Sequence, residues 1–232
     1  GILDADIYGP SQPQLLGVAD QRPELRDQKN LLPIKAHGIQ SMSMGYLLSE
    51  NTPAVWRGPM ASGALQQLIF QTDWHDLDYL FVDMPPGTGD IHLTLSQQVP
   101  VSGAVVVTTP QDIALLDAKK AIEMFAKVNT PILGVVENMA VYQCSQCGYQ
   151  EHIFGEGGGA RIAKDYGSQL LGALPLALAI REQADGGNPT VVADPEGDIA
   201  SIYRQTAQKI AAALWRQQCL ADAGPEIVIS DD

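Results

Sequence analysis

Short runs of apolar residues alternate along the chain with segments whose apolar positions repeat every three or four residues. Uninterrupted apolar runs are typical of strands buried on both faces of a parallel sheet, and the other segments are typical of the helices that cover such a sheet. The alternation predicts an α/β fold, with a doubly wound, mostly parallel sheet and helices on both faces. The predicted strands are Gly1–Leu3, Tyr79–Asp83, Ala104–Thr108, Ile132–Val136 and Leu170–Leu174.

The segments between these strands have the periodicity of amphipathic helices. The clearest, Asp112–Val128, repeats its apolar residues at spacings of three and four, which predicts the crossover helix of a βαβ unit. Asp112 follows a proline, and we expect its side chain to cap this helix. The other predicted helices are Ala61–Phe70, Ala160–Leu171 and Asp198 to about Trp215.

The length of the chain fits a single domain of this type. We expect residues 1–221 of the 232 to form it, with a cysteine-containing insertion loop at 142–159 and an acidic tail at 222–232. Residue 1 is not a methionine, and residues 1–4 already resemble the end of a buried strand. We therefore expect the chain to be part of something longer.

The net charge of the chain narrows the classes of molecule that it is expected to bind. Twenty-seven acidic residues outweigh fourteen Lys and Arg, which gives a formal net charge of −13 and an isoelectric point near 4.5. Such a chain is a poor unassisted ligand for nucleic acids or anionic membranes. No apolar run approaches the roughly 20 residues of a membrane span, and the first six residues, Gly-Ile-Leu-Asp-Ala-Asp, contain neither the basic region nor the cleavage site of a signal peptide. We expect a cytoplasmic protein with neither nucleic acid nor membrane as a partner.

Acidic residues follow two of the predicted strands, at the edge of the sheet where ligands bind in such folds. Asp83 ends an apolar run and precedes Pro-Pro-Gly-Thr-Gly-Asp, whose glycines permit a close approach of the backbone to a ligand. A carboxylate in this place caps the next turn or holds a divalent cation beside a phosphate, and the glycines favour the cation. Asp4 and Asp6 face the same side of an extended segment, either next to Mg²⁺ or an attacking water or in a solvated turn.

Cys144 and Cys147 form a Cys-x-x-Cys pair followed by glycine, the shape of a metal-binding turn. Since a tetrahedral zinc or a four-iron cluster takes about four ligands, one pair fills half a site. A symmetric dimer that brings two pairs together would complete it. Cys219 lies far along the chain, and we expect it to be incidental. Three alternatives remain: a cluster that bridges a dimer, a zinc site with His152 as an added ligand, and a redox dithiol, which the polar loop disfavours.

Two further features suggest no site. The glycine run at 155–159 lacks the Lys-Ser/Thr of a phosphate loop, and Glu156 would repel an anion, so we expect a flexible connector. His37, His75 and His92 have no neighbouring ligand residues at a recognisable spacing, and we do not expect them to be catalytic.

Six motifs, in order, link the chain to a known family. They are Gly1–Ser11, Trp56–Met60, Val82–Asp90, Thr108–Asp112, Gly134–Met139, and Cys144-x-x-Cys147 followed by His152–Gly155. This series resembles the Mrp (ApbC-type) iron–sulfur carrier ATPases, deviant-Walker P-loop NTPases of the class that includes MinD and the nitrogenase iron protein. The resemblance extends from Gly1 to about Leu214.

The resemblance implies roles for individual residues. Asp6 would orient or activate the hydrolytic water, and Asp4 would lie beside Mg²⁺. Asp83 would match the Walker-B aspartate, which reaches Mg²⁺ through water, and Gly87 the glycine whose N–H senses the γ-phosphate. Asn138 would read the edge of the adenine, a role that suits the donor and acceptor of its amide.

The resemblance also implies cofactors and partners. ATP and Mg²⁺ would bind at a homodimer interface, with Trp56–Met60 in the dimer-facing segment. Cys144 and Cys147 of both subunits would hold a labile [4Fe–4S] cluster across the two-fold axis. The protein would transfer this cluster to apo iron–sulfur proteins, alongside cluster-assembly scaffolds, with ATP hydrolysis coupled to the transfer.

One large departure concerns the phosphate-binding loop. The family's Lys-Gly-Gly-x-Gly-Lys-Ser/Thr motif is absent from the sequence, and so is the strand expected before it. The chain is then a fragment of an ATPase, which the presence of Asp6, Asp83 and Asn138 favours, or a metal-binding relative without nucleotide turnover. A MinD-like membrane ATPase is disfavoured because the tail is acidic, where such proteins need a basic amphipathic helix.

Overall fold

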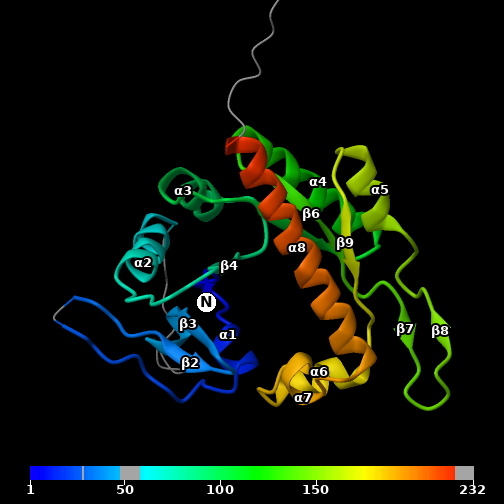
Figure 1. Cartoon of the computed structure of the whole chain (residues 1–232), viewed down its shortest axis with the longest axis horizontal. Helices are drawn as coiled ribbons and strands as arrows, with labels where there is room; N and C mark the ends of the chain where they lie inside the picture. Colours follow the sequence, from blue (N-terminus) through cyan, green and yellow to red (C-terminus); the bar gives the residue numbers. More distant parts are fainter. Residues whose placement is uncertain (28, 48–57, 223–232) are drawn as a thin grey trace, which may run out of the picture.

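Two mostly parallel sheets form the framework of the chain, and within the described residues no strand of one sheet pairs with a strand of the other. The structure is a computed structural model that describes residues 1–27, 29–47 and 58–222 (Figure 1). The first sheet has the order β2-β3-β1-β4 and the second the order β5-β6-β9. The strands are β1 (Ile2–Asp4), β2 (Ile34–Ala36), β3 (Ile39–Ser43), β4 (Phe81–Asp83), β5 (Ala104–Thr108), β6 (Ile132–Glu137) and β9 (Leu170–Ala173).

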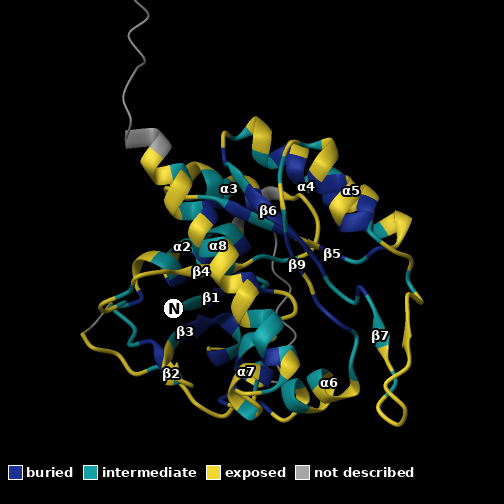
Figure 2. Cartoon of the chain, turned by 45° about the vertical axis from the view of Figure 1, so that its right-hand side comes forward, coloured by how far each residue is buried: buried dark blue, intermediate teal, exposed yellow. Residues whose placement is uncertain are grey.

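The second sheet has helices on both faces. Adjacent residues of its central strand, β6, point to opposite sides of the sheet, so their neighbours show which helices cover each face. Val135 of β6 is buried with residues of α4 (Asp112–Lys127) and α5 (Gly158–Asp165). Val136 packs instead with residues of β9 and α8 (Asp198–Asp222), on the other face (Figure 2). This parallel sheet, covered on both sides, confirms the predicted α/β class.

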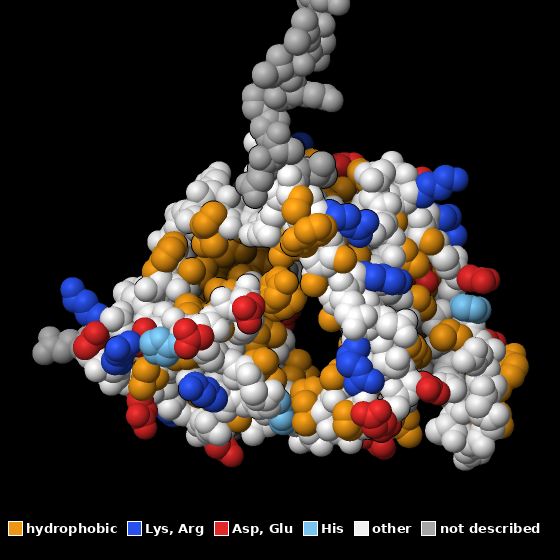
Figure 3. Space-filling view, viewed as in Figure 1, with side chains coloured by type: hydrophobic (Ala, Val, Ile, Leu, Met, Phe, Trp, Pro, Cys, Tyr) orange, Lys and Arg blue, Asp and Glu red, His pale blue; other side chains and the backbone are white. Residues whose placement is uncertain are grey.

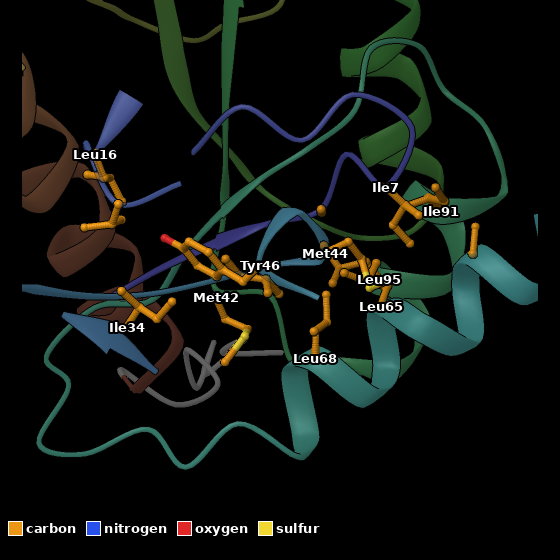
Figure 4. Packing of buried hydrophobic residues seen from close by; sticks show 14 residues of the cluster. Ile7, Leu16, Ile34, Met42, Met44, Tyr46, Leu65, Leu68, Ile91 and Leu95 are labelled. Carbon is orange, nitrogen blue, oxygen red and sulfur yellow. The ribbon is translucent and has the colours of Figure 1, made fainter. Parts of the chain in front are cut away.

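The core of the first half of the chain (residues 1–101) lies between its sheet and two helices, α2 (Gly58–Phe70) and α3 (Asp90–Gln98). Leu65 and Leu68 of α2 pack in one buried cluster with Leu95 of α3 and Met42 of β3 (Figure 4). Tyr46 is fully buried there, and its hydroxyl lies 2.7 Å from the Ser41 hydroxyl, so the polar end of the ring is paired. The buried clusters of the second half (residues 102–222) are separate from this one.

β4 and β5 are edge strands, which corrects the expectation that their sequences are fully buried. β4 is paired with β1 on one side, and β5 with β6 on one side. Phe81 of β4 is 52% exposed and Val107 of β5 is 61% exposed. Figure 3 shows hydrophobic side chains gathered in a hollow on one face of the molecule. Both strands have the composition of interior strands, but neither has a second neighbour in the part of the chain that the structure describes.

Some helix ends and caps differ from the sequence prediction. α5 ends at Asp165 and not near Leu171, because Gly167 adopts the left-handed conformation (φ 62°) that terminates helices, and β9 follows. Asp112 is the first residue of α4 and not its cap, since Gln111 occupies the capping position without a side-chain hydrogen bond. An acidic side chain in the first turn still interacts favourably with the helix dipole.

The last helix, α8, continues past Trp215 to Asp222, so it is longer than predicted. Trp56, Arg57 and the tail from residue 223 lie outside the described residues. Within the described ranges, no helix is both long and apolar enough to cross a membrane. The elements that the sequence pattern did not predict are α1 (Gln12–Leu15), a 3-10 helix (Met44–Tyr46), α3, α6 (Leu178–Asp185), α7 (Thr190–Ala193), the β2–β3 hairpin, and the hairpin of β7 (Tyr142–Gln143) and β8 (Gln150–Glu151).

The two halves meet where α1 contacts α6. Gly17 and Gly187, which follow these helices, have positive φ angles of 68° and 67°. A Cβ atom on Gly187 would lie 2.3 Å from the Cα of Gly17, so the two backbones touch. The His37 imidazole Nε2 lies 3.1 Å from the carbonyl oxygens of both Leu16 and Gly187, which joins the halves at the same point. Glycine is therefore required at both positions.

This joint predicts a loss of stability in Gly187→Ala. Gly38 also has a positive φ (79°), but a Cβ there would meet nothing within 4 Å, so Gly38→Ala isolates the backbone strain. We expect Gly38→Ala to lower the free energy of unfolding by about 1 kcal/mol. Gly187→Ala should cost about 1–3 kcal/mol more, because its Cβ also displaces the opposite backbone. Urea unfolding of both variants measures the difference in the free energy of unfolding. Equal losses in the two variants would contradict a close backbone contact at this joint.

Candidate functional site

Three strands of the first sheet end side by side in polar residues. Asp4 of β1 is in register with Ser43 of β3 on one side and with Asp83 of β4 on the other. The Ala5 N–H donates to the Asp83 carbonyl at 2.8 Å and continues the pairing past the strand ends. The structure therefore brings the carboxylates of two strands, Asp4 and Asp83, to one edge of the sheet.

Asp4 is an almost completely buried carboxylate with four hydrogen-bond donors. Its Oδ2 accepts from the backbone N–H of Ser11 (2.9 Å) and Gln12 (3.0 Å) and from the Ser43 hydroxyl (3.0 Å). Its Oδ1 accepts from the Asp6 N–H at 3.2 Å. Burial raises the pKa of Asp4, and the hydrogen bonds from Gln12, Ser43, Asp6 and Ser11 oppose that shift. Asp4 thus anchors the loop that leads into α1, and a cation would have to compete with these donors.

Asp83 differs from Asp4 because its side chain is exposed to solvent. The Gln12 side-chain amide donates to its Oδ2 at 2.7 Å. Gln12 is also one of the residues that Asp4 holds through the backbone, so Asp4 fixes the backbone from which this amide reaches Asp83. Nothing in the sequence singles out Gln12, since the contact arises from the fold of the loop between β1 and α1.

Asp6 lines an open cleft between the loop after β1 and the segment after β4. The cleft has a volume of about 550 Å³ and is also lined by Gly9, Pro85 and His92. The Oδ1 of Asp6 accepts from the backbone N–H groups of Tyr8 (3.1 Å) and Gly9 (3.0 Å), which fixes the turn. Both loops that the sequence singles out therefore border one space.

Gly87 lies in the exposed segment after β4, which also borders this cleft. Its φ is 99°, and a Cβ there would meet nothing within 4 Å. The positive φ requires glycine, and the open space leaves room for a ligand to approach the backbone.

Asn138 belongs to the second half, at the carboxyl end of β6. Its backbone N–H donates to the Thr108 carbonyl at 2.7 Å, and its side-chain Oδ1 accepts from the Met139 N–H at 3.0 Å. The side chain is half-buried. Asn138 does not line the cleft that contains Asp6, so the structure distributes the sequence-predicted residues over both halves.

The cysteine pair lies in the turn of the β7–β8 hairpin. The Cys144 N–H donates to the Tyr149 carbonyl and the Gly148 N–H to the Cys144 carbonyl, both at 2.9 Å, and Gly148 has a φ of 71°. Hydrogen bonds from the backbone of Gln146 and Cys147 lower the pKa of the Cys144 thiol, which favours the thiolate. Cys144 is half-exposed and Cys147 is exposed, and both are free thiols. The turn is thus preorganised to bind a soft metal centre.

A single chain supplies only part of a metal centre at this turn. Within the described residues, no three His, Cys, Asp or Glu side chains are grouped so that they could hold an ion. The imidazole Nδ1 of His152 lies 2.8 Å from the Ala140 carbonyl, which fixes the end of the hairpin. The structure therefore does not support a zinc site formed by the two cysteines and His152 of one chain.

The last two glycines of the run at 155–159 are closely packed at the start of α5, which corrects the expectation of a flexible connector for that part of the run. A Cβ on Gly158 would lie 2.8 Å from the Leu115 side chain, and one on Gly159 would lie 2.9 Å from the Cβ of Glu137. The buried Glu137 carboxylate accepts a 2.5 Å hydrogen bond from the Gly159 N–H. Because a carboxylate already takes this donor at the start of α5, the run is not a phosphate cradle.

His92 of α3 is the buried histidine of the cleft. It is 5% exposed, and its Nδ1 has no hydrogen-bond partner among the residues that the structure describes. Burial lowers its pKa, and a hydrogen bond with the Pro85 backbone partly opposes the shift. The folded protein therefore favours the neutral imidazole.

The environment of His92 predicts that the free energy of unfolding decreases at acidic pH. Below the ordinary pKa of 6.5, the unfolded chain binds a proton that the folded protein does not, so the free energy of unfolding decreases as the pH falls. His92→Gln should remove this part of the pH dependence. Urea unfolding at several pH values between about pH 7.5 and about pH 5.5 measures how the free energy of unfolding depends on pH. An unchanged slope in His92→Gln would show that the folded site accepts the proton.

Comparison with known proteins shows which family the chain belongs to. Residues 1–211 match the ParA family described as NUBPL iron-transfer P-loop NTPase. The iron–sulfur cluster carrier protein of Pseudomonas fragi is 65% identical over 208 residues, 89% of this chain and 72% of its own length. That of Escherichia coli K12 is 58% identical over 217 residues, 94% of this chain, and the chain spans 59% of its length.

A solved structure has the same fold. The nucleotide-binding protein of Archaeoglobus fulgidus in complex with ADP has a TM-score of 0.72 and 34% identity, over 88% of this chain and 78% of that one. These similarities confirm the resemblance and the fold class expected from the sequence motifs. The chain belongs to the NUBPL iron-transfer group of P-loop NTPases within the ParA family.

Proposed function

We propose that this chain carries an iron–sulfur cluster on Cys144 and Cys147 and delivers it to apo iron–sulfur proteins. The observation that carries the proposal is the turn itself, in which backbone N–H groups stabilise the thiolate of the half-exposed Cys144 beside the exposed Cys147. Relatives that are named iron–sulfur cluster carrier proteins support it. An exposed site suits a cargo that must leave, since a buried cluster could not reach an acceptor.

The cluster bridges two chains in this proposal. A [4Fe–4S] cluster takes about four thiolates, and the hairpin supplies two. A two-fold axis through the cluster makes the set complete, with the same pair donated by each subunit. Cluster-assembly scaffolds and apo-proteins are the proposed donors and acceptors, in the cytoplasm, without nucleic acid or membrane.

The longer protein also binds and hydrolyses ATP in this proposal, and the residues of the cleft fit part of that site. Asp83 presents an exposed carboxylate at the end of β4, and Gly87 leaves open space in front of its backbone. Mg²⁺, when bound, neutralises charge on the phosphates. Asp83 would hold the water shell of the cation, Asp6 would orient the attacking water, and the backbone of Gly87 would contact the γ-phosphate.

Asn138 and Asp4 complete the proposed nucleotide site. The Asn138 amide would bind the adenine edge from the second half of the chain. Asp4 would act mainly by holding α1 and Gln12, since its carboxylate is already occupied by four donors. The reaction, ATP and water to ADP and phosphate, then depends on positioning and electrostatic stabilisation.

In this proposal the phosphate loop is supplied by residues outside this sequence, because its motif is absent from residues 1–232. In P-loop proteins a strand leads into the loop. The unpaired edges of β4 and β5 each offer a row of backbone groups to one more strand, and their exposed apolar side chains favour such a neighbour. The E. coli relative, of which this chain spans 59%, has the length for it.

Anaerobic reconstitution with iron and sulfide tests the carrier function on the chain itself. We expect roughly four irons per two chains and a visible thiolate-to-iron absorbance band. The Cys144→Ala, Cys147→Ala double variant should remain colourless while keeping its fold. A colourless wild-type protein that holds stoichiometric zinc would favour the second candidate, a metal-binding relative without cluster delivery.

Asp83→Asn separates the two proposed activities. In a longer form that includes the phosphate loop, this variant should lose at least about tenfold of its Mg²⁺-dependent ATP hydrolysis, because the amide holds the cation's waters more weakly. Its iron content should not change, since Asp83 lies in the other half of the chain. Cys144→Ala should do the reverse. Loss of hydrolysis in Cys144→Ala, with full iron loading in it, would contradict this division.

A further inference from the structure

We propose that His92 is a positioning residue for the proposed ATP hydrolysis, because it tethers the neighbouring segment 85–88 at the edge of the cleft. The inference rests on the proposed nucleotide site and adds a residue that holds part of that site in place. His92 is assigned no contact with the nucleotide or the attacking water, so it is not a catalytic residue.

The hydrogen bond between His92 and the backbone of Pro85 has a defined direction. Proline has no N–H, so Pro85 offers only its carbonyl oxygen and the imidazole must donate. Because Nδ1 has no partner within the described residues, the donor is Nε2. Burial favours the neutral ring, so its proton lies on Nε2 and Nδ1 carries a free lone pair.

The helix α3 gives His92 a rigid base. Ile91 and Leu95 of this helix belong to the buried cluster that also contains Leu65 of α2 (Figure 4). His92 lies in the first turn of α3, where side chains point back toward the N-terminus of the helix and so toward the preceding segment. The packed helix therefore holds the imidazole, and the imidazole holds Pro85.

The segment 85–88 depends on this contact because it belongs to neither a strand nor a helix. Before it, Met84 packs against the buried cluster, and after it α3 begins at Asp90. Within the described residues, the bond from His92 is the one hydrogen bond that attaches 85–88 to the rest of the molecule. Without this bond, the segment would be held only from its two ends.

The tethered carbonyl is close in sequence to both groups that are proposed to act on the ligand. Pro85 is two residues after Asp83 and two before Gly87. The intervening Pro86 has a fixed φ, so few backbone rotations separate the tether from Gly87. The tether therefore limits where the Gly87 backbone, the proposed contact of the γ-phosphate, can lie.

The unpaired Nδ1 distinguishes a positioning role from a structural one. A buried polar atom without a partner destabilises the folded protein, and an apolar side chain of similar size would avoid that cost. His92→Leu is therefore expected to keep or raise stability while it removes the tether. If His92 served stability alone, its loss would lower stability and hydrolysis together.

The test compares three substitutions of His92 with one control. His92→Gln places an amide donor where Nε2 lies, His92→Asn places one only where Nδ1 lies, and His92→Leu has no donor. Ser96→Ala is the matched control on α3, because the Ser96 hydroxyl donates to the His92 carbonyl at 2.9 Å and takes no part in the contact with Pro85. In the full chain, NMR relaxation gives the backbone order parameter of Gly87, and urea unfolding gives the stability. In the longer form that includes the phosphate loop, steady-state kinetics give kcat and KM for ATP.

We expect His92→Leu and His92→Asn to lower the order parameter of Gly87 below about 0.6 and to lower kcat about tenfold, with KM for ATP nearly unchanged. His92→Gln and Ser96→Ala should keep both values near those of the wild type. The urea midpoint of His92→Leu should not fall.

Several outcomes would overturn the inference. An equal loss of order and of kcat in His92→Gln would show that the donor at Nε2 does not matter. An ordered Gly87 with normal kcat in His92→Leu, or a wild-type order parameter already below about 0.6, would show that no tether acts there. A loss of stability in His92→Leu that accompanies its loss of kcat would indicate a structural role. If the wild-type longer form did not hydrolyse ATP, the proposed activity and the role of His92 in it would both be wrong, and the order parameters would still decide whether the tether exists.

Discussion

The organisation of the cleft depends on one buried charge, the carboxylate of Asp4. A buried carboxylate is stable only when donors surround it, and here four are supplied by the loop to α1 and by Ser43 of β3. Satisfying that charge fixes where the chain goes after β1. It also sets the backbone position of Gln12, whose side chain binds Asp83. A residue that would not touch the reacting groups thus determines the geometry of those that would.

In the proposed function, the two halves of the chain supply different groups. The first half holds the carboxylates and the cleft, and the second half holds Asn138 and the cysteine hairpin. Their sheets do not pair within the described residues, and the glycine joint at Gly17 and Gly187 sets one point of contact. Coupling between the proposed nucleotide and cluster sites would pass through such connections. The helix α1 is one of them, since Asp4 holds Gln12 at its start and Gly17 just after its end lies at the joint.

Much of this arrangement follows from sequence pattern, and the exceptions have physical reasons. The strands β5, β6 and β9 and the helices α4 and α8 were predictable because their apolar pattern is strong, and the polar residues after the strands marked the carboxyl edge. The exposure of the Tyr79–Asp83 strand was not predictable, because it depends on which strands lie beside it. The glycine run at 155–159 looked flexible, since sequence does not reveal the packing of Leu115 and Glu137 against it. Gln12 is invisible to sequence analysis for the same reason, as its role comes from a tertiary contact.

The way the cysteine hairpin is attached has a consequence for how such a protein could arise. The segment leaves β6 at Glu137 and returns at Gly159, and a single hydrogen bond joins these two residues. His152 and Ala140 close it a second time farther out. Both ends are thus tied at one edge of the second sheet, and Ala140 and Gln143 also donate backbone hydrogen bonds to Leu174 and Leu176. A loop that is anchored at its base in this way can change at its tip without disturbing the sheet, so the cysteine turn could be gained or lost in evolution while the sheet is kept.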